Sequence, residues 1–182
     1  MGNRGVITTE DKRIGVYLHW NGGRDSVEAF LTYCDIKGYR PPECDCYGWA
    51  RLCQVIGNYF GGILSVGIDL YERLDKENGD NGVYIIKNWG IVGREFFEGH
   101  EQDEYKIKDM LNDIDKCQPT SEQLGEEKIK TYLVEKGIIR ICPKCKKEYS
   151  GYPAISRRDN RTEICSDCGV AEAFEDFIDK GE

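Results

Sequence analysis

The spacing of apolar residues divides the first third of the chain into strand-like and helix-like stretches. Residues 13–20 are rich in β-branched and aromatic side chains and end at a glycine pair, which predicts a strand running into a tight turn. A helix should follow, capped by Asp25 or Ser26, because the next apolar residues recur at helical spacing as far as Cys34. The same spacing predicts a second helix over 49–60, which stops before another glycine pair.

The middle of the chain changes to short β-prone runs. These runs predict strands over 63–69, 83–87 and 91–97, and we interpret them as an antiparallel meander because turn-forming residues separate the first two. Helical spacing returns over 104–117, and a short charged helix is predicted over 126–136 after a polar linker.

Together these elements predict the α+β class, with mixed helices and an antiparallel sheet. The 182 residues allow one ordinary domain and a small appendage, and 40% hydrophobic residues are enough for a core. We expect an α+β body over 1–117, an acidic connector over 118–137 and a zinc-ribbon-like tail over 138–182.

The charge balance limits the classes of partner. The chain has 25 Lys and Arg against 33 Asp and Glu, a net charge of −8, which excludes a protein whose whole surface binds phosphates. The first ten residues lack the features of a secretory signal, and the longest charge-free stretch, 52–68, is interrupted by glycines and is too short to span a membrane. We therefore expect a cytoplasmic protein without membrane contact.

Cysteine spacing in the tail gives the strongest chemical signal. Two C-x2-C pairs separated by 19 residues fall within the spacing typical of a four-thiolate zinc site. The predicted ligands are Cys142, Cys145, Cys165 and Cys168. Four thiolates close the coordination shell, so we expect a structural zinc ion without catalysis; another thiophilic metal or cluster, or a redox dithiol, is the alternative.

Basic residues gather between the two cysteine pairs, interleaved with tyrosines. This pattern is typical of a surface for nucleic acid or an acidic partner. The candidate binding residues are Lys144, Lys146, Lys147, Arg157, Arg158 and Arg161. The alternative is that Arg157 and Arg158 form surface ion pairs with Asp159 and Glu163. A terminal helix is predicted over 171–178.

Weaker patterns elsewhere do not specify an active site. The turn at 21–24 could cradle an anion at a helix N-terminus, but it lacks the known phosphate-binding motifs and is typical of a plain strand-to-helix turn. Cys44 and Cys46 are too close together for a good zinc pair, and His19 has no neighbouring nucleophile in sequence. We therefore expect a binding protein rather than an enzyme; an enzyme using His19 and the glycine turn is the remaining alternative.

Several segments of the chain resemble the sequences of a known group of proteins. Segments in the body and in the tail resemble small proteins carried by phages and integrative elements of Gram-positive gut bacteria. The segments that carry this resemblance are Tyr17–Phe30, Arg40–Pro42, Tyr47–Arg51, Asn78–Tyr84, Tyr152–Asn160 and Ile164–Gly169.

Within that group, the length and layout are similar to a type II-A anti-CRISPR protein. The resemblance implies an inhibitor that binds the RNA-guided type II effector nuclease and blocks DNA binding or cleavage. It provides no inhibitory motif that can be matched residue by residue. The rival hypothesis is a mobile-element accessory protein that binds DNA or RNA through its zinc ribbon.

Overall fold

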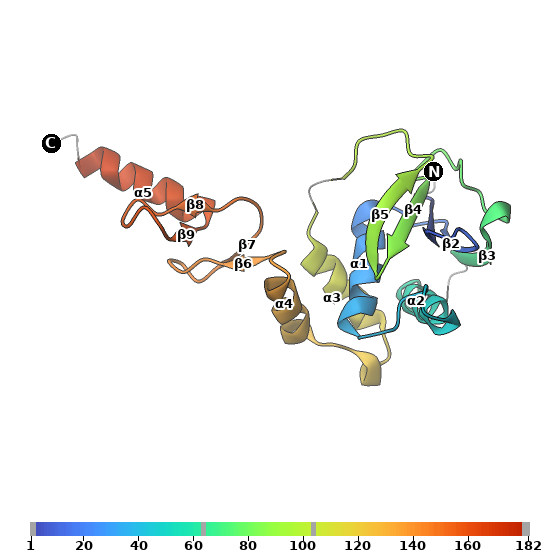
Figure 1. Ribbon diagram of the computed structural model, residues 1–182. Coiled ribbons are helices and arrows are strands. Elements are labelled where there is room, and N and C mark those ends of the chain that lie inside the picture. Colours follow the sequence, from blue (N-terminus) through green and yellow to red (C-terminus); the bar gives the residue numbers. More distant parts are fainter. Residues whose placement is uncertain (1–2, 63–64, 103–104, 180–182) are drawn as a thin grey trace. The chain divides into compact units, whose positions relative to one another are not determined.

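The computed structural model describes residues 3–62, 65–102 and 105–179, which form two compact units (Figure 1). The first unit spans 1–129 and the second spans 130–182. The boundary falls inside helix α4 (Glu126–Glu135), which matches the charged helix predicted there. Helices together with mostly antiparallel sheets confirm the α+β class.

The first unit contains a five-stranded sheet with the order β3-β2-β1-β4-β5. Its strands are β1 (Gly5–Thr9), β2 (Ile14–Leu18), β3 (Val66–Leu70), β4 (Val83–Lys87) and β5 (Gly90–Glu95). Neighbouring strands are antiparallel except β1 and β4, which run parallel. The predicted meander is therefore wrong in part: β4 and β5 form its hairpin, but β3 pairs with β2. Residues 63 and 64 of the predicted strand lie outside the described residues.

Strand β1 was not predicted, and its burial explains why. All five of its residues are buried. Ile7 pairs with Val16 and lies on one face, whereas Val6 lies on the other face, in a cluster with Tyr71 of the short 3-10 helix Tyr71–Arg73. A strand covered on both faces lacks the polar alternation by which half-buried strands are recognised in a sequence.

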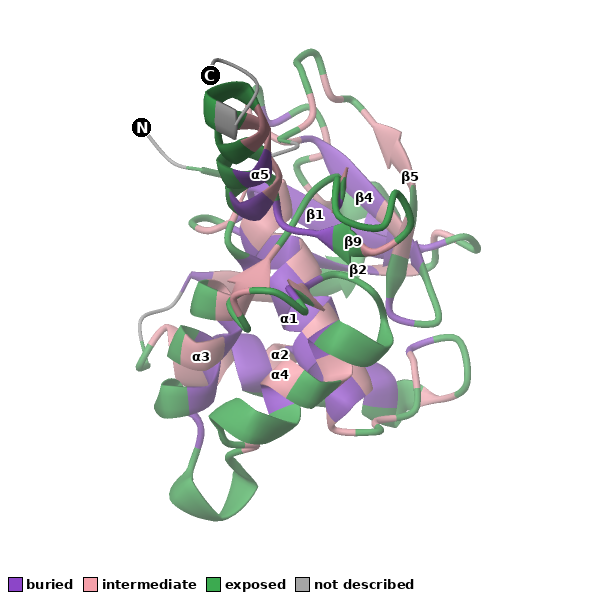
Figure 2. Cartoon of the chain, turned by 90° about the vertical axis from the view of Figure 1, so that its left-hand side faces the viewer, coloured by how far each residue is buried: buried purple, intermediate pink, exposed green. Residues whose placement is uncertain are grey.

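Three helices complete the core of the first unit. These are α1 (Arg24–Ile36), α2 (Cys46–Tyr59) and α3 (Ile107–Cys117), and each contacts the other two. Helix α1 also contacts β5 and α2 contacts β3, so the two edge strands of the sheet are each held by a helix. Figure 2 shows the buried residues of this unit concentrated on the strands β1 and β4 and on the inner faces of α1 and α2.

The N-termini of α1 and α2 differ from the predicted ones. Helix α1 begins after Gly23, which has no side chain to cap it, and the Asp25 carboxylate instead accepts a hydrogen bond from the Ser26 backbone N–H. The preceding Gly22 passes so close to β1 that an added Cβ would lie 2.5 Å from the Gly5 nitrogen. Helix α2 begins earlier than predicted because Asp45 caps it by accepting from the Tyr47 N–H.

The segment after α3 is attached to the first unit and is not a free connector. The Asp115 carboxylate accepts hydrogen bonds from the backbone N–H groups of Leu124 and Gly125 and from the Tyr33 hydroxyl. The buried Gln118 amide donates to the carbonyl oxygens of Val55 and Ile114. The short 3-10 helix Thr120–Glu122 lies within this segment. The expected connector, 118–137, is therefore divided between the two units.

None of the helices in the described ranges is long and apolar enough to cross a membrane.

Candidate metal centre

The second unit consists of two short antiparallel hairpins followed by a helix. Its elements are β6 (Arg140–Ile141), β7 (Glu148–Tyr149), β8 (Ala154–Ile155), β9 (Glu163–Ile164) and α5 (Ser166–Asp179). Strand β6 pairs with β7 and β8 pairs with β9. The terminal helix begins at Ser166, before the predicted 171–178, so that Cys165 lies between β9 and the helix and Cys168 lies in the first turn of the helix.

Each cysteine pair is held in a tight backbone turn. In the first pair, the Cys142 N–H donates to the Lys147 carbonyl, and the Lys146 N–H donates to the Cys142 carbonyl. Lys146 has φ +61°, the left-handed conformation that lets the chain reverse direction there. In the second pair, the first turn of α5 is closed by the Gly169 N–H, which donates to the Cys165 carbonyl.

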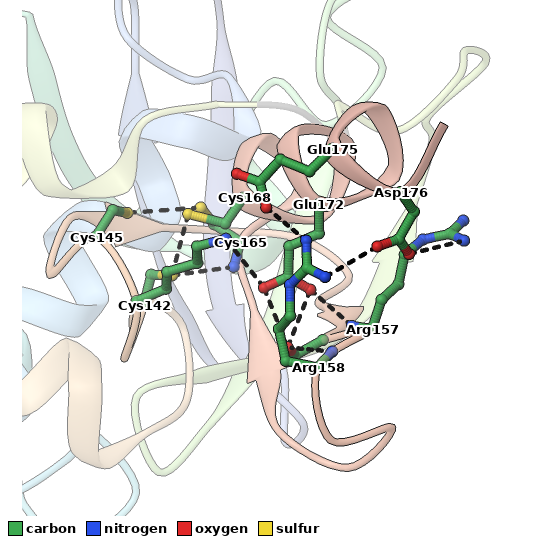
Figure 3. Close-up of polar contacts among 11 residues, drawn as sticks. Cys142, Cys145, Arg157, Arg158, Cys165, Cys168, Glu172, Glu175 and Asp176 are labelled. Atoms are coloured by element: carbon green, nitrogen blue, oxygen red, sulfur yellow. Dashed lines mark hydrogen bonds and ion pairs between the residues drawn. The ribbon is translucent and has the colours of Figure 1, made fainter. Parts of the chain in front are cut away.

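The four sulfurs converge on one point between these turns (Figure 3). Their Sγ atoms all lie within 4.8 Å of one another, and the pairs Cys142–Cys168 and Cys145–Cys165 are separated by 3.8 and 3.7 Å. A tetrahedral ion with metal–sulfur bonds of about 2.3 Å places its sulfur ligands about 3.8 Å apart. The predicted cysteines are therefore brought together in an arrangement that can hold a metal ion.

The surroundings of the sulfurs shift the pKa values of Cys142 and Cys168 in opposite directions. Burial opposes ionisation of Cys142, but hydrogen bonds from the backbone N–H groups of Cys145, Cys165 and Lys144 lower its pKa to about 6. Burial and the neighbouring sulfurs raise the pKa of Cys168 to about 12. The chain alone thus favours a thiolate at Cys142 and a neutral thiol at Cys168, and a bound cation would supply the positive charge that stabilises both as thiolates.

A buried carboxylate connects the two halves of the unit. The Glu172 side chain is 2% exposed and accepts a hydrogen bond from the Lys144 ammonium and one from the Arg157 backbone N–H. The Ser156 hydroxyl lies within 3.1 Å of both carboxylate oxygens. Burial would raise the pKa of Glu172, yet the contacts with Lys144, Arg157 and Ser156 keep it below its ordinary value.

Sequence reasoning missed Glu172, although helical spacing offered a signal. On a helix that starts at the second cysteine pair, Glu172 follows Cys168 by four residues and therefore shares its face. Gly169, on the adjoining part of the helix, lets α5 approach β8, because an added Cβ would lie 2.5 Å from the Ala154 Cβ.

The six predicted binding residues are not one free basic surface. Arg158 pairs with Glu175 and Asp176 of α5 at 2.5 and 2.9 Å, and Arg157 lies 4.0 Å from Asp176 (Figure 3). The predicted pairs with Asp159 and Glu163 are wrong, since Asp159 accepts hydrogen bonds within its own turn. Lys144 is held by Glu172, whereas the side chains of Lys146, Lys147 and Arg161 form no ion pair among the described residues.

The weaker candidates lie in the first unit. Among the described residues, Cys44 and Cys46 belong to no group of three or more potential metal ligands, whereas the four cysteines of the second unit do. His19 is exposed, and its Nδ1 lies 3.2 Å from the Tyr17 hydroxyl. At the glycine turn, the Asp25 N–H already donates to the Gln102 side chain, as in a plain strand-to-helix turn.

Comparison of the chain with protein families, with curated proteins and with solved structures found no match.

Proposed function

We propose that the four cysteines of the second unit hold a structural zinc ion. The observation that carries this proposal is the sulfur spacing of 3.7 and 3.8 Å, which fits a tetrahedral four-thiolate shell. A borderline-soft ion without a strong geometric preference suits such a ligand set. Since four sulfurs leave no position for water or substrate, the ion would stabilise the fold and would not take part in catalysis.

Metal analysis of the purified protein tests the zinc proposal. We expect one zinc ion per chain, lost in Cys142→Ser and retained in Cys44→Ser, a matched substitution of an exposed cysteine outside the cluster. Isolation of a protein free of metal, with a stably folded second unit, would contradict it. Recovery of iron instead of zinc would support the presence of a metal site but would reject the assignment of the metal as zinc.

We further propose that the protein acts by stoichiometric binding, as an anti-CRISPR inhibitor of the RNA-guided type II effector nuclease in the bacterial cytoplasm. The sequence resemblance names this partner, and charge supports it. The chain carries a net charge of −8, while such nucleases hold nucleic acid in a strongly positive channel.

A binding assay with the guide-loaded nuclease tests this function. The purified protein should block DNA binding or cleavage near one molar equivalent, and a pull-down with and without guide RNA should show which form it binds. Normal DNA binding and cleavage in the presence of excess protein would reject the inhibitor proposal. Because the readout does not involve the metal, this outcome leaves the zinc proposal intact.

The rival function, DNA or RNA binding by an accessory protein, has one observation in its favour. Three of the predicted basic residues, Lys146, Lys147 and Arg161, remain without ion pairs within the described part of the second unit. A salt-dependent shift of DNA or RNA that is lost in Lys146→Ala/Lys147→Ala/Arg161→Ala would favour this function over inhibition. An isolated protein that leaves both nucleic acids unshifted at low salt would reject it.

A further inference from the structure

Helix α5 exposes a continuous apolar stripe. Val170, Phe174, Phe177 and Ile178 are 55, 65, 78 and 68% exposed. Their spacing of four, three and one residues puts them on one face of the helix. Figure 2 shows this helix exposed over much of its surface. Single exposed apolar residues are common, but an aligned set with two phenylalanines is typical of an interaction surface.

The orientation of α5 is fixed by its other face. Cys168, Glu172 and Asp176 follow one another at four-residue intervals and point toward the hairpins, where they meet the other cysteines, Lys144 and the arginines (Figure 3). The helix cannot rotate its apolar stripe inward without separating Cys168 from the other three cysteines and breaking these ion pairs. The stripe therefore stays outside as a consequence of how the unit is held together.

The core of the second unit is small. Its buried cluster consists of Ile164 and three of the cysteines, with Cys145, Tyr149 and Ala154 partly buried around it. The two phenylalanines of the unit lie outside this cluster. Units of this size lack enough internal apolar burial for high stability, and natural ones add metals or oligomer contacts.

We propose that two copies of this chain pair through the α5 stripes about a two-fold axis. The four residues of the stripe are uncharged, and the acidic Glu175 and Asp176 beside it are paired with Arg158. The exposed Asp167 lies on the same face in the first turn of the helix, outside the stripe. A helical stripe is also complementary to itself under two-fold symmetry. The proposal concerns the second unit alone and does not depend on the nuclease.

The available area is sufficient for such a pair. At about 200 Å² for a fully exposed aromatic side chain, the stripe offers on the order of 500 Å² per copy. A two-fold pair that covered the whole stripe of both copies would then bury at most roughly 1,000 Å² in total, which is the size of a weak, reversible interface. We therefore expect a reversible dimer whose population rises with protein concentration.

Sedimentation equilibrium of the full, metal-loaded chain tests the pairing. The wild type should approach twice the 20.8 kDa mass of one chain as its concentration is raised. Phe174→Asp/Phe177→Asp should raise the dissociation constant of the dimer at least about tenfold, because charged side chains would replace the apolar contact. The control is Tyr152→Asp, which changes a 94% exposed aromatic residue of the same unit outside the helix and should leave the dimer intact.

Metal content and far-UV circular dichroism verify that each variant is folded. A wild type that stays monomeric at its highest soluble concentration overturns the proposal. A dimer unaffected by the stripe variant, or weakened equally by Tyr152→Asp, overturns it too. If the chain is monomeric and the stripe variant loses binding to the nuclease instead, the stripe is a surface for that partner and self-pairing is rejected.

Discussion

At the scale of single residues, buried carboxylates determine how segments are joined. Asp115 connects α1, α3 and the segment that follows, and Glu172 connects α5 to the hairpins. In the sequence both belong to acidic stretches typical of a solvated surface. Asp115 nevertheless follows the buried Leu111 by four residues and shares its helix face, which is how it reaches the interior. Spacing could have revealed the burial of Asp115, but not its hydrogen-bond partners, because these come from distant parts of the chain.

Asp115→Ala should lower the free energy of unfolding of the first unit by about 3 kcal/mol, since it removes the carboxylate that accepts hydrogen bonds from the buried Tyr33 hydroxyl and from the Leu124 and Gly125 N–H groups. Denaturation followed by tryptophan fluorescence measures this, because Trp20, Trp49 and Trp89 all lie in the first unit. Asp113→Ala on the exposed face of the same helix is the control and should change stability little. Equal effects of the two substitutions would show that the hydrogen bonds of Asp115 do not stabilise the first unit.

Glu95 gives the first unit a defined dependence on pH. Its carboxylate accepts a hydrogen bond from Lys12 at 2.5 Å and one from the Tyr71 hydroxyl at 3.1 Å, and the Lys12 contact lowers its pKa below the ordinary value of 4.5. A lowered pKa in the folded state means that Glu95 stabilises the fold above pH 4.5 and loses this contribution as the pH falls through the folded-state pKa.

Glu95→Gln should therefore cost up to about 1 kcal/mol at neutral pH, and the difference from wild type should shrink below pH 4.5. Tryptophan-monitored denaturation at several pH values measures that difference. Glu98→Gln, at an exposed position nearby, is the control and should change the free energy of unfolding little at neutral pH. A difference between wild type and Glu95→Gln that stays constant with pH would reject the assignment.

At the scale of elements, helical spacing predicted the helices of both units, while partners distant in sequence decided their ends and the strand order. The apolar pattern of α2 indicated its existence, but its start depends on Asp45 and on the close approach of Gly48 to the proline pair. Likewise, the hairpin of β4 and β5 is local and was predicted, whereas the pairing of β4 with β1 joins strands far apart in the chain. Such long-range pairing leaves no local mark in the residue pattern.

Two glycines of α2 should respond in opposite ways to alanine. A Cβ on Gly48 would lie 2.5 Å from the Pro42 backbone nitrogen, so Gly48→Ala should destabilise the first unit by about 2 kcal/mol. A Cβ on Gly57 has nothing within 4 Å, and Gly57→Ala should stabilise it by about 0.5–1 kcal/mol through helix propensity. Tryptophan-monitored denaturation compares the two; stabilisation by Gly48→Ala would show that α2 does not lie against the prolines.

At the scale of the whole molecule, the two units draw on different sources of stability. The first has a conventional apolar core, while the buried cluster of the second is made mainly of the cysteines. The cysteine spacing was enough to predict that these four side chains converge, because a metal shell requires a short and regular motif. The pairing of Lys144, Arg157 and Arg158 with α5 depends on where that helix lies, and the sequence contains no equivalent motif for it.

A strong chelator should therefore unfold the second unit and leave the first folded. Limited proteolysis should then cut within 130–182, while the tryptophan-monitored unfolding curve of the first unit stays unchanged. Restoring zinc should restore protection, whereas magnesium, which prefers oxygen ligands, should not. Loss of both units at the same chelator concentration, or resistance of the second unit to chelation, would contradict this division.

The central position of β1 has a consequence for biosynthesis. Although β1 precedes β2, β3, β4 and β5 along the chain, it lies between β2 and β4 in the finished sheet. As the chain emerges from the ribosome, β2 can cover one side of β1 almost at once, but the other side must wait until Val83–Lys87 has been translated. During that interval β1 keeps one edge unpaired, and an unpaired strand edge is a place where partly folded chains can associate and aggregate.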